Sequence, residues 1–238
     1  MKKRTKLILS GIAIVAAGLG AAHWYYGDRG RFTTEPVFTD LGRSASGNEL
    51  VSTYDPAAVL TFGDEYRYLG GQKFILYGVA DTEQHFFVET TEDDVLKSLY
   101  WIQYEAYLPD KSYTYDYDDS PLRVTLGDVE FFTDTDVFEF DPTIERRRGT
   151  DGAAARAFLA RHGYTYPRHN AYARLVYLTD ESRQKELMII VIDDLEDYGY
   201  ATAALEEGGE SADRWPEVEA TFLDRIRDTL DVSLATGE

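Results

Sequence analysis

Residues 172–178 read YARLVYL and residues 186–192 read ELMIIVI, with the polar run DESR at 180–183 between them. Both outer runs are rich in β-branched and aromatic residues, which favour strands, and the polar residues between them predict a hairpin. The second run is apolar at almost every position rather than at alternate ones, which indicates a strand buried on both faces. We therefore expect a central strand of a sheet that is covered above and below.

Short runs of similar composition recur from Ala57 onward, separated by glycine or by acidic residues: VLTFG, KFILYGV, QHFFVET, RVTL, VEFF and DVFEF. Only two segments predict helices. In the first, AAARAFLARH follows a Thr150-Asp151 cap and precedes Gly163. In the second, EVEATFLDRIRDTL follows Pro216 and repeats an apolar residue every four positions.

A doubly wound parallel sheet would need a helix after nearly every strand, and this sequence offers too few. The predicted fold class is therefore α+β. We expect a largely antiparallel sheet with two amphipathic helices, preceded by one N-terminal transmembrane helix.

The N-terminus joins positive charge to an apolar run. Residues 1–6, MKKRTK, predict a cytoplasmic basic segment, and residues 7–26, which end in HWYY, predict a transmembrane signal anchor. A cleavable signal peptide is the alternative. Both interpretations place the rest of the chain outside the cytoplasm, because positive charges stay on the cytoplasmic side. Residues 27–56, with glycine, serine and proline, predict a flexible spacer, and residues 57–238 the extracytoplasmic α+β domain.

Composition excludes several classes of function. The formal net charge is −19, so the protein repels phosphate backbones and nucleic-acid binding is not expected. The chain has no cysteine, which excludes disulfides, thiol chemistry and cysteine-ligated zinc. The sequence also lacks HExxH, GxSxG and phosphate-loop motifs, so zinc-protease, acyl-transfer and phosphoryl-transfer chemistry have no support.

Residues 113–119 read YTYDYDD, a tyrosine at every second position with acids between. The turn-forming run PDKS precedes them and predicts a hairpin with residues 98–108, SLYWIQYEAYL. In that register Glu105 faces Asp116, and Asp118 lies one pair further along the same face. Like charges placed opposite each other destabilise a sheet unless something compensates them. We expect a bound cation, a shared proton, or acids that turn apart into solvent.

Two site hypotheses follow from this face. Oxygen ligands for calcium, the one cofactor that the sequence suggests, are offered by Glu105, Asp116 and Asp118. Alternatively, Glu105 and Asp116 form the carboxyl pair of a glycosidase-like hydrolase, with Trp101 and Tyr107 as exposed aromatic surfaces beside them.

Three consecutive arginines form a separate candidate site. Arg146, Arg147 and Arg148 immediately precede the first predicted helix, where free backbone N–H groups and arginine side chains favour an anionic ligand. The alternative is that they pair with acidic side chains of the same domain or with acidic groups of a partner.

These observations favour a membrane-anchored extracytoplasmic binding or scaffolding domain of the cell envelope, with no catalytic activity identified. Its expected partners are the membrane, through residues 7–26, and an envelope protein or a small ligand. The alternative is an envelope hydrolase that uses Glu105 and Asp116.

Overall fold

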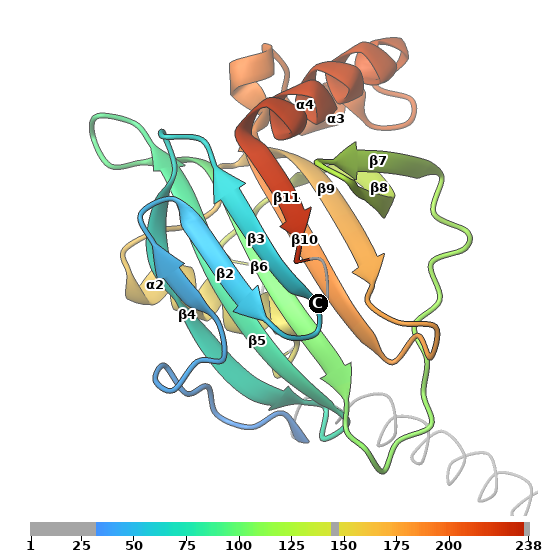
Figure 1. The fold of residues 1–238 in the computed structure, drawn as a ribbon. Coiled ribbons are helices and arrows are strands. Elements are labelled where there is room, and N and C mark those ends of the chain that lie inside the picture. Colours follow the sequence, from blue (N-terminus) through green and yellow to red (C-terminus); the bar gives the residue numbers. More distant parts are fainter. Residues whose placement is uncertain (1–31, 144–147, 236–238) are drawn as a thin grey trace, which may run out of the picture.

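The computed structural model describes residues 32–143 and 148–235, and a seven-stranded antiparallel sheet forms their centre (Figure 1). Its strands lie in the order β4 (Arg67–Leu76), β5 (Ala80–Thr90), β6 (Leu96–Tyr107), β10 (Lys185–Asp194), β9 (His169–Leu178), β8 (Val129–Glu139) and β7 (Leu122–Leu126). The strand β10 is central, and it pairs with β9 so that Glu186 faces Leu178. The predicted hairpin of residues 172–192 is thus confirmed.

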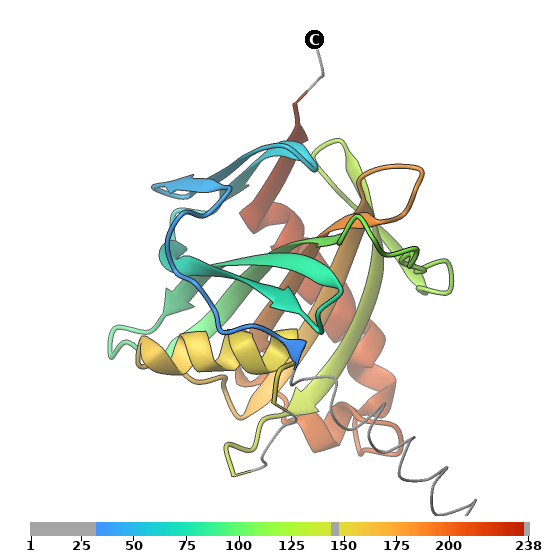
Figure 2. The ribbon, with the colours of Figure 1, turned by 90° about the horizontal axis from the view of Figure 1, so that it is seen from below.

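A four-stranded antiparallel sheet covers one face of the larger sheet (Figure 2). Its strands lie in the order β1 (Ser44–Ser46), β2 (Glu49–Thr53), β3 (Ala57–Phe62) and β11 (Leu230–Leu234). The last described strand, β11, pairs with β3 from the beginning of the domain, so this sheet joins the two ends of the described chain.

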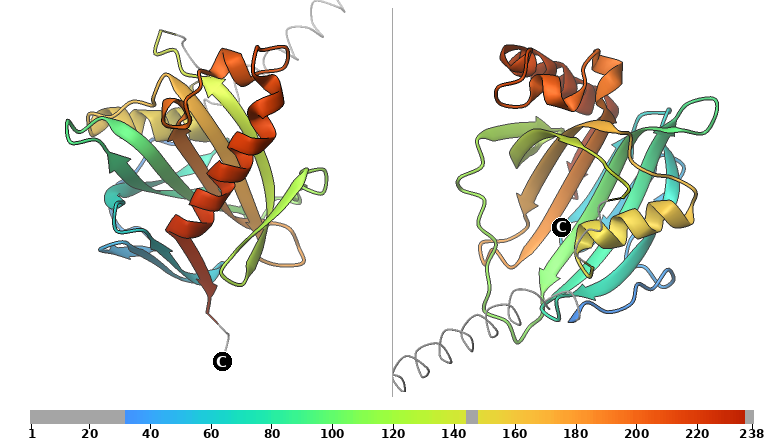
Figure 3. Two further views of the ribbon diagram at one scale, coloured as in Figure 1. Left: turned by 90° about the horizontal axis from the view of Figure 1, so that it is seen from above. Right: turned by 180° about the vertical axis from the view of Figure 1, so that it is seen from behind.

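Both predicted helices are present. The helix α2 (Asp151–Arg161) lies on the other face of the seven-stranded sheet (Figure 3). The Thr150 hydroxyl accepts a hydrogen bond from the Ala153 N–H, as an N-cap should. The helix α4 (Trp215–Thr229) leads directly into β11. Shorter helical segments precede α4: the 3₁₀ turns η2 (Leu195–Tyr198) and η3 (Ala212–Arg214), and the single-turn helix α3 (Thr202–Leu205).

The alternation of side chains on β10 separates two cores. Leu187, Ile189 and Val191 pack with residues of the four-stranded sheet and of α4, whereas Met188 and Ile190 pack with residues of α2. Successive side chains of a strand point to opposite faces, so a run apolar at every position is what two covered faces require. The chain therefore has a sheet-rich α+β fold with antiparallel sheets and few helices, as predicted.

The second predicted hairpin is wrong. Both edges of β6 are occupied by long strands, β5 on one side and β10 on the other, and residues 113–117 form no strand. Glu105 consequently faces Thr82 and Glu186 rather than Asp116. The turn signal of residues 109–112 is local. It is outweighed by the pairing of β6 with β5 along one edge and with β10 along the other, which places β6 in the interior of the sheet.

Part of the predicted spacer is structured. Within residues 27–56, β1 and β2 belong to the smaller sheet, Leu50 is fully buried, and Gly42 and Arg43 donate backbone N–H groups to the Glu83 carboxylate at 2.8 and 2.9 Å. Gly47, with a φ of +62°, lies in the tight turn between β1 and β2, whereas Ser44 and Ser46 lie in β1 itself. The prediction of a flexible spacer is therefore wrong for these strands.

Residues 1–31 lie outside the described residues, and with them the basic segment, the predicted anchor and the first part of the spacer. In the ranges 32–143 and 148–235, none of the helices has the length and apolar character that a membrane crossing requires.

Candidate functional site

Two buried carboxyl groups, those of Glu105 and Glu186, lie side by side in the sheet, whereas the sequence predicted that Glu105 would face Asp116. Glu105 on β6 and Glu186 on β10 are direct cross-strand neighbours, so they share the α2 face of the sheet, and Glu186 is only 2% exposed. Burial raises the pKa of Glu105 to about 7. Burial, together with the charge of Glu105, raises the pKa of Glu186 to about 8. At neutral pH the pair therefore retains a proton.

Hydrogen bonds indicate which carboxyl group retains this proton. Both oxygens of Glu105 accept a hydrogen bond, one from the Tyr115 hydroxyl at 2.8 Å and one from the Gln103 side-chain amide at 2.7 Å. Glu186 accepts one, from the Tyr117 hydroxyl at 2.7 Å. A carboxyl group that accepts at both oxygens is stabilised as the anion, so the proton resides on Glu186.

Buried glutamines lead to this pair across three strands. The Gln72 amide donates to Gln84, the Gln84 amide donates to Gln103, and the Gln103 amide donates to Glu105, each at 2.7 Å. Since every donor in the row points the same way, the row fixes the orientation of three amides and ends at the Glu105 carboxylate.

The residues 113–118, here called the tyrosine segment, cover the pair. Tyr115 and Tyr117 point to the sheet, where Tyr115 stacks on Tyr107 with 4.4 Å between ring centroids. Asp116 and Asp118 are exposed and form ion pairs with Arg183 at 3.3 and 3.0 Å. The alternation read from YTYDYDD is therefore present in part: Tyr115 and Tyr117 lie inside and the acids outside, whereas Tyr113 is 53% exposed.

This arrangement overturns the predicted carboxylate sites. Glu105 lies on the sheet side of the tyrosine segment, whereas Asp116 and Asp118 lie on its solvent side, so neither the hydrolase pair nor the calcium ligand set is formed. Throughout the described part of the chain, no three histidine, aspartate or glutamate side chains gather closely enough to hold a metal ion.

Of the predicted surface aromatics, Trp101 is buried, with 5% exposure, because it projects from β6 toward α2, and Tyr107 is partly buried under Tyr115. The prediction that Trp101 is exposed is therefore wrong.

A cavity of about 400 Å³ adjoins the carboxyl pair on the same face of the sheet. It lies between the beginning of α2 and strands β6, β8, β9 and β10, and its lining is mainly apolar and aromatic: Trp101, Val137, Phe138, Tyr166, Tyr172, Met188, Ile190 and Ile192, with Gly152 and four charged residues, Asp136, Asp151, Arg156 and Arg174. The indole nitrogen of Trp101 is buried and has no hydrogen-bond partner among the described residues.

Charged groups connect the cavity with the carboxyl pair. Burial is the largest cause of the raised pKa of Glu105 and of Glu186, and the negative charge of Asp151 makes a smaller contribution in the same direction. The positive charge of Arg174 lowers the pKa of Glu186. The guanidinium group of Arg174 forms an ion pair with Asp134 at 2.8 Å. A ligand in the cavity would therefore alter the electrostatic surroundings of the pair.

The arginine cluster is only partly described. Arg146 and Arg147 lie outside the described residues, and Arg148 is exposed just before α2. Two N–H groups of the first turn of α2 are already bonded, Gly152 to the Asp151 carboxylate at 2.7 Å and Ala153 to the Thr150 hydroxyl at 3.0 Å. The anion site stays a prediction, without support from free donors at these two positions.

Sequence reasoning missed three of these features. Glu186 is the acid that opens the otherwise apolar run ELMIIVI, and a charged residue at a buried position of a central strand is a usable signal. The cavity has no local signal, because its lining comes from five separate elements.

The third missed feature is a buried cluster in which His85 contacts the Glu83 carboxylate at 2.8 Å and the Tyr68 hydroxyl at 2.9 Å. Glu83 also accepts the backbone N–H groups of Gly42 and Arg43, so this cluster fastens the segment before β1 to the larger sheet.

The elements that carry the candidate site are thus strands β6, β8, β9 and β10, helix α2 and the tyrosine segment, brought together from distant parts of the sequence. Comparison with known proteins found no family model, no curated protein and no solved structure that matches this chain.

Proposed function

We propose that this protein is a non-enzymatic, membrane-anchored extracytoplasmic binding domain of the cell envelope, and that it binds a small organic ligand in the cavity between α2 and the seven-stranded sheet. The cavity is the observation that carries the proposal. Its volume of about 400 Å³ lies within the range of about 300–1,000 Å³ that small-molecule sites occupy. Its lining combines apolar side chains with a few polar ones, which is the composition of such sites.

Hydrolysis by paired carboxyl groups has weaker support. A glycosidase needs two carboxyl groups that flank one substrate and reach water. Glu105 and Glu186 are close neighbours, but Glu186 is buried and the hydroxyls of Tyr115 and Tyr117 occupy their oxygens. Neither glutamate lines the cavity. The pair is therefore better placed to hold the tyrosine segment on the sheet than to meet a substrate.

The indole N–H signal of Trp101 in a nuclear magnetic resonance spectrum tests ligand binding. We expect that, in a screen of cationic, neutral and anionic organic molecules of about ten non-hydrogen atoms against the full chain, at least one class shifts this signal and raises the melting temperature. The Trp101→Phe variant identifies the signal.

The indole signal of Trp215 is the internal control, since Trp215 lies on α4 and packs in the other core. A Trp101 signal that no class of molecule moves, or that moves only together with the Trp215 signal, contradicts the proposal.

The membrane anchor is tested by topology. Four cationic residues precede the apolar run of residues 7–26, so a reporter active only outside the cytoplasm is expected to be active when fused after Glu238. Retention in the membrane fraction after a high-salt wash supports an anchor, and loss of the residues before His23 indicates a cleaved signal peptide. Activity of a reporter that works only in the cytoplasm refutes the export proposal.

A further inference from the structure

Two carboxylates of the cavity have no cationic partner. Asp136 and Asp151 both line it, and no lysine, arginine or histidine of the described residues forms an ion pair with either. Each accepts a short hydrogen bond from the backbone N–H that follows it, Val137 at 2.8 Å and Gly152 at 2.7 Å. Their remaining charge is therefore available to a ligand.

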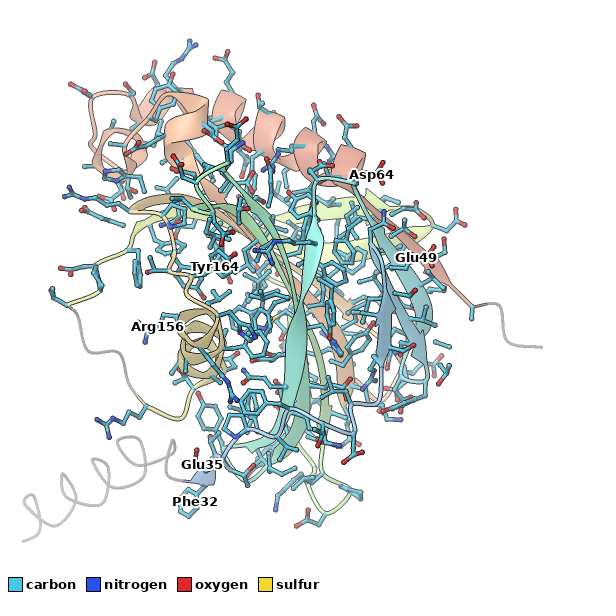
Figure 4. The ribbon with its side chains drawn as sticks, turned by 90° about the vertical axis from the view of Figure 1, so that its left-hand side faces the viewer. Phe32, Glu35, Glu49, Asp64, Arg156 and Tyr164 are labelled. Carbon is cyan, nitrogen blue, oxygen red and sulfur yellow. The ribbon has the colours of Figure 1, made fainter. Side chains whose placement is uncertain are left out.

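The two arginines of the cavity are already engaged. Asp134 holds the guanidinium group of Arg174 at 2.8 and 3.3 Å, and Arg156, on α2 (Figure 4), also has an interaction partner. Asp134 thus compensates the charge of Arg174, whereas neither Asp136 nor Asp151 has a cationic partner among the described residues.

The aromatic side chains of the cavity present ring faces in different directions. The ring of Phe138 stands nearly perpendicular to the rings of Tyr166 and Tyr172, at 82° and 77°, with centroids 6.2 and 6.3 Å apart. Trp101 lines the same cavity. The face of an aromatic ring attracts a cation, and several rings around one space are the usual surroundings of quaternary ammonium groups.

Three carboxylates and one arginine act on Tyr172 at the cavity. Burial raises the pKa of Tyr172 to about 12; among the charged groups Arg174 has the largest effect and lowers this pKa, whereas Asp151, Asp134 and Asp136 raise it. The whole chain has a formal net charge of −19, which raises the concentration of cations near its surface. An anionic ligand would meet both the uncompensated acids and this general repulsion.

We infer that the cavity selects an organic cation, an alkylammonium or quaternary ammonium compound whose charge lies near Asp136 and Asp151 among the aromatic rings. This inference rests on the proposed function, since it names the chemical class of the ligand that the cavity binds.

Three probes of one shape and different charge test the inference. Choline is the cation, 3,3-dimethylbutan-1-ol is the neutral molecule of the same shape, and 3,3-dimethylbutanoate is the anion. In calorimetric titrations of the full chain we expect choline to bind at least tenfold more tightly than the alcohol, and the anion to bind most weakly. Added salt should weaken only the choline complex.

Single-charge variants locate the interaction. Asp136→Asn and Asp151→Asn should each weaken choline binding about tenfold, the loss of one charge contact, and leave binding of the neutral alcohol unchanged. Asp128→Asn, which removes an exposed carboxylate from the turn between β7 and β8, is the matched control and should leave choline binding unchanged. Melting curves of the free variants show whether each is folded.

The outcomes separate this inference from the proposed function. If the alcohol or the anion binds as tightly as choline, or if both carboxylate variants bind choline normally, selection of a cation is refuted while small-ligand binding stands. If none of the probes binds and the wider screen also leaves the Trp101 signal unchanged, both proposals are refuted.

Discussion

The Glu186→Gln variant is expected to melt several degrees above the wild-type protein near pH 9, and within about a degree of it near pH 4. Glutamine keeps the size of the side chain and an oxygen that can accept from the Tyr117 hydroxyl, but it cannot ionise. The difference between the two proteins should therefore grow as the pH rises from the pKa of Glu186 in the unfolded protein to its higher pKa in the folded protein.

The direction follows from the pKa of Glu186. Burial raises this pKa to about 8 in the folded protein, against 4.5 for an ordinary glutamate. Between these values the folded state binds more protons than the unfolded state, so the free energy of unfolding falls as the pH rises. The contribution of Glu186 to the free energy of unfolding is fully present below pH 4.5. It declines as the pH rises and is lost once the pH passes about 8. Glutamine at position 186 cannot ionise, so the variant lacks this decrease in the free energy of unfolding. The charged Glu105 also no longer faces a second carboxylate on β10.

Thermal melts of both proteins across this pH range provide the measurement. Glu181→Gln is the control, because it removes one exposed charge from the turn between β9 and β10. If Glu181→Gln raises the melting temperature near pH 9 as much as Glu186→Gln does, the gain reflects the net charge of the protein and not the buried pair. If neither variant changes the pH dependence, Glu186 is not protonated in the folded protein.

The largest loss of stability is expected for Arg225→Ala. Arg225 lies on α4 and forms ion pairs with Asp193 at the end of β10 and with Glu89 on β5. Asp193 is 1% exposed, so removing the guanidinium group leaves a buried carboxylate without a cation. Such a change costs about 3–5 kcal/mol, which lowers the melting temperature of a protein of this size by about 10 °C.

Matched variants separate this charge effect from the loss of packing. Arg227→Ala, two residues further along α4, breaks an exposed ion pair with Asp224 and should change the free energy of unfolding by less than about 1 kcal/mol. Adding Asp193→Asn to Arg225→Ala should restore part of the stability, because the buried charge is gone. A double variant less stable than Arg225→Ala alone would show that the uncompensated charge of Asp193 is not the cause.

Local sequence patterns predicted the strands and helices whose formation depends on residues close together in the sequence. The run ELMIIVI predicted a strand covered on both faces, and the Thr150 cap predicted the beginning of α2, since both depend on near neighbours in sequence. The alternation in YTYDYDD likewise predicted which side chains share a face.

The choice of partners for β6 could not be predicted in the same way. The run PDKS is compatible with a hairpin, but β5 and β10 pair with β6 along almost its whole length, which the short tyrosine segment could not do. That competition is between distant segments. The wrong strand partner placed Asp116 opposite Glu105, where the structure has Glu186 on one side and Thr82 on the other.

The pairing of β11 with β3 has a consequence for the order in which the protein can assemble. A chain that leaves a ribosome or a translocation channel N-terminus first presents β3 long before β11 exists. Until then β3 has β2 on one side and an unpaired edge on the other, and an unpaired strand edge is a template for association with other chains. The smaller sheet can close only when β11 emerges, so the edge of β3 stays open to association with other chains while the residues between Phe62 and Leu230 are synthesised.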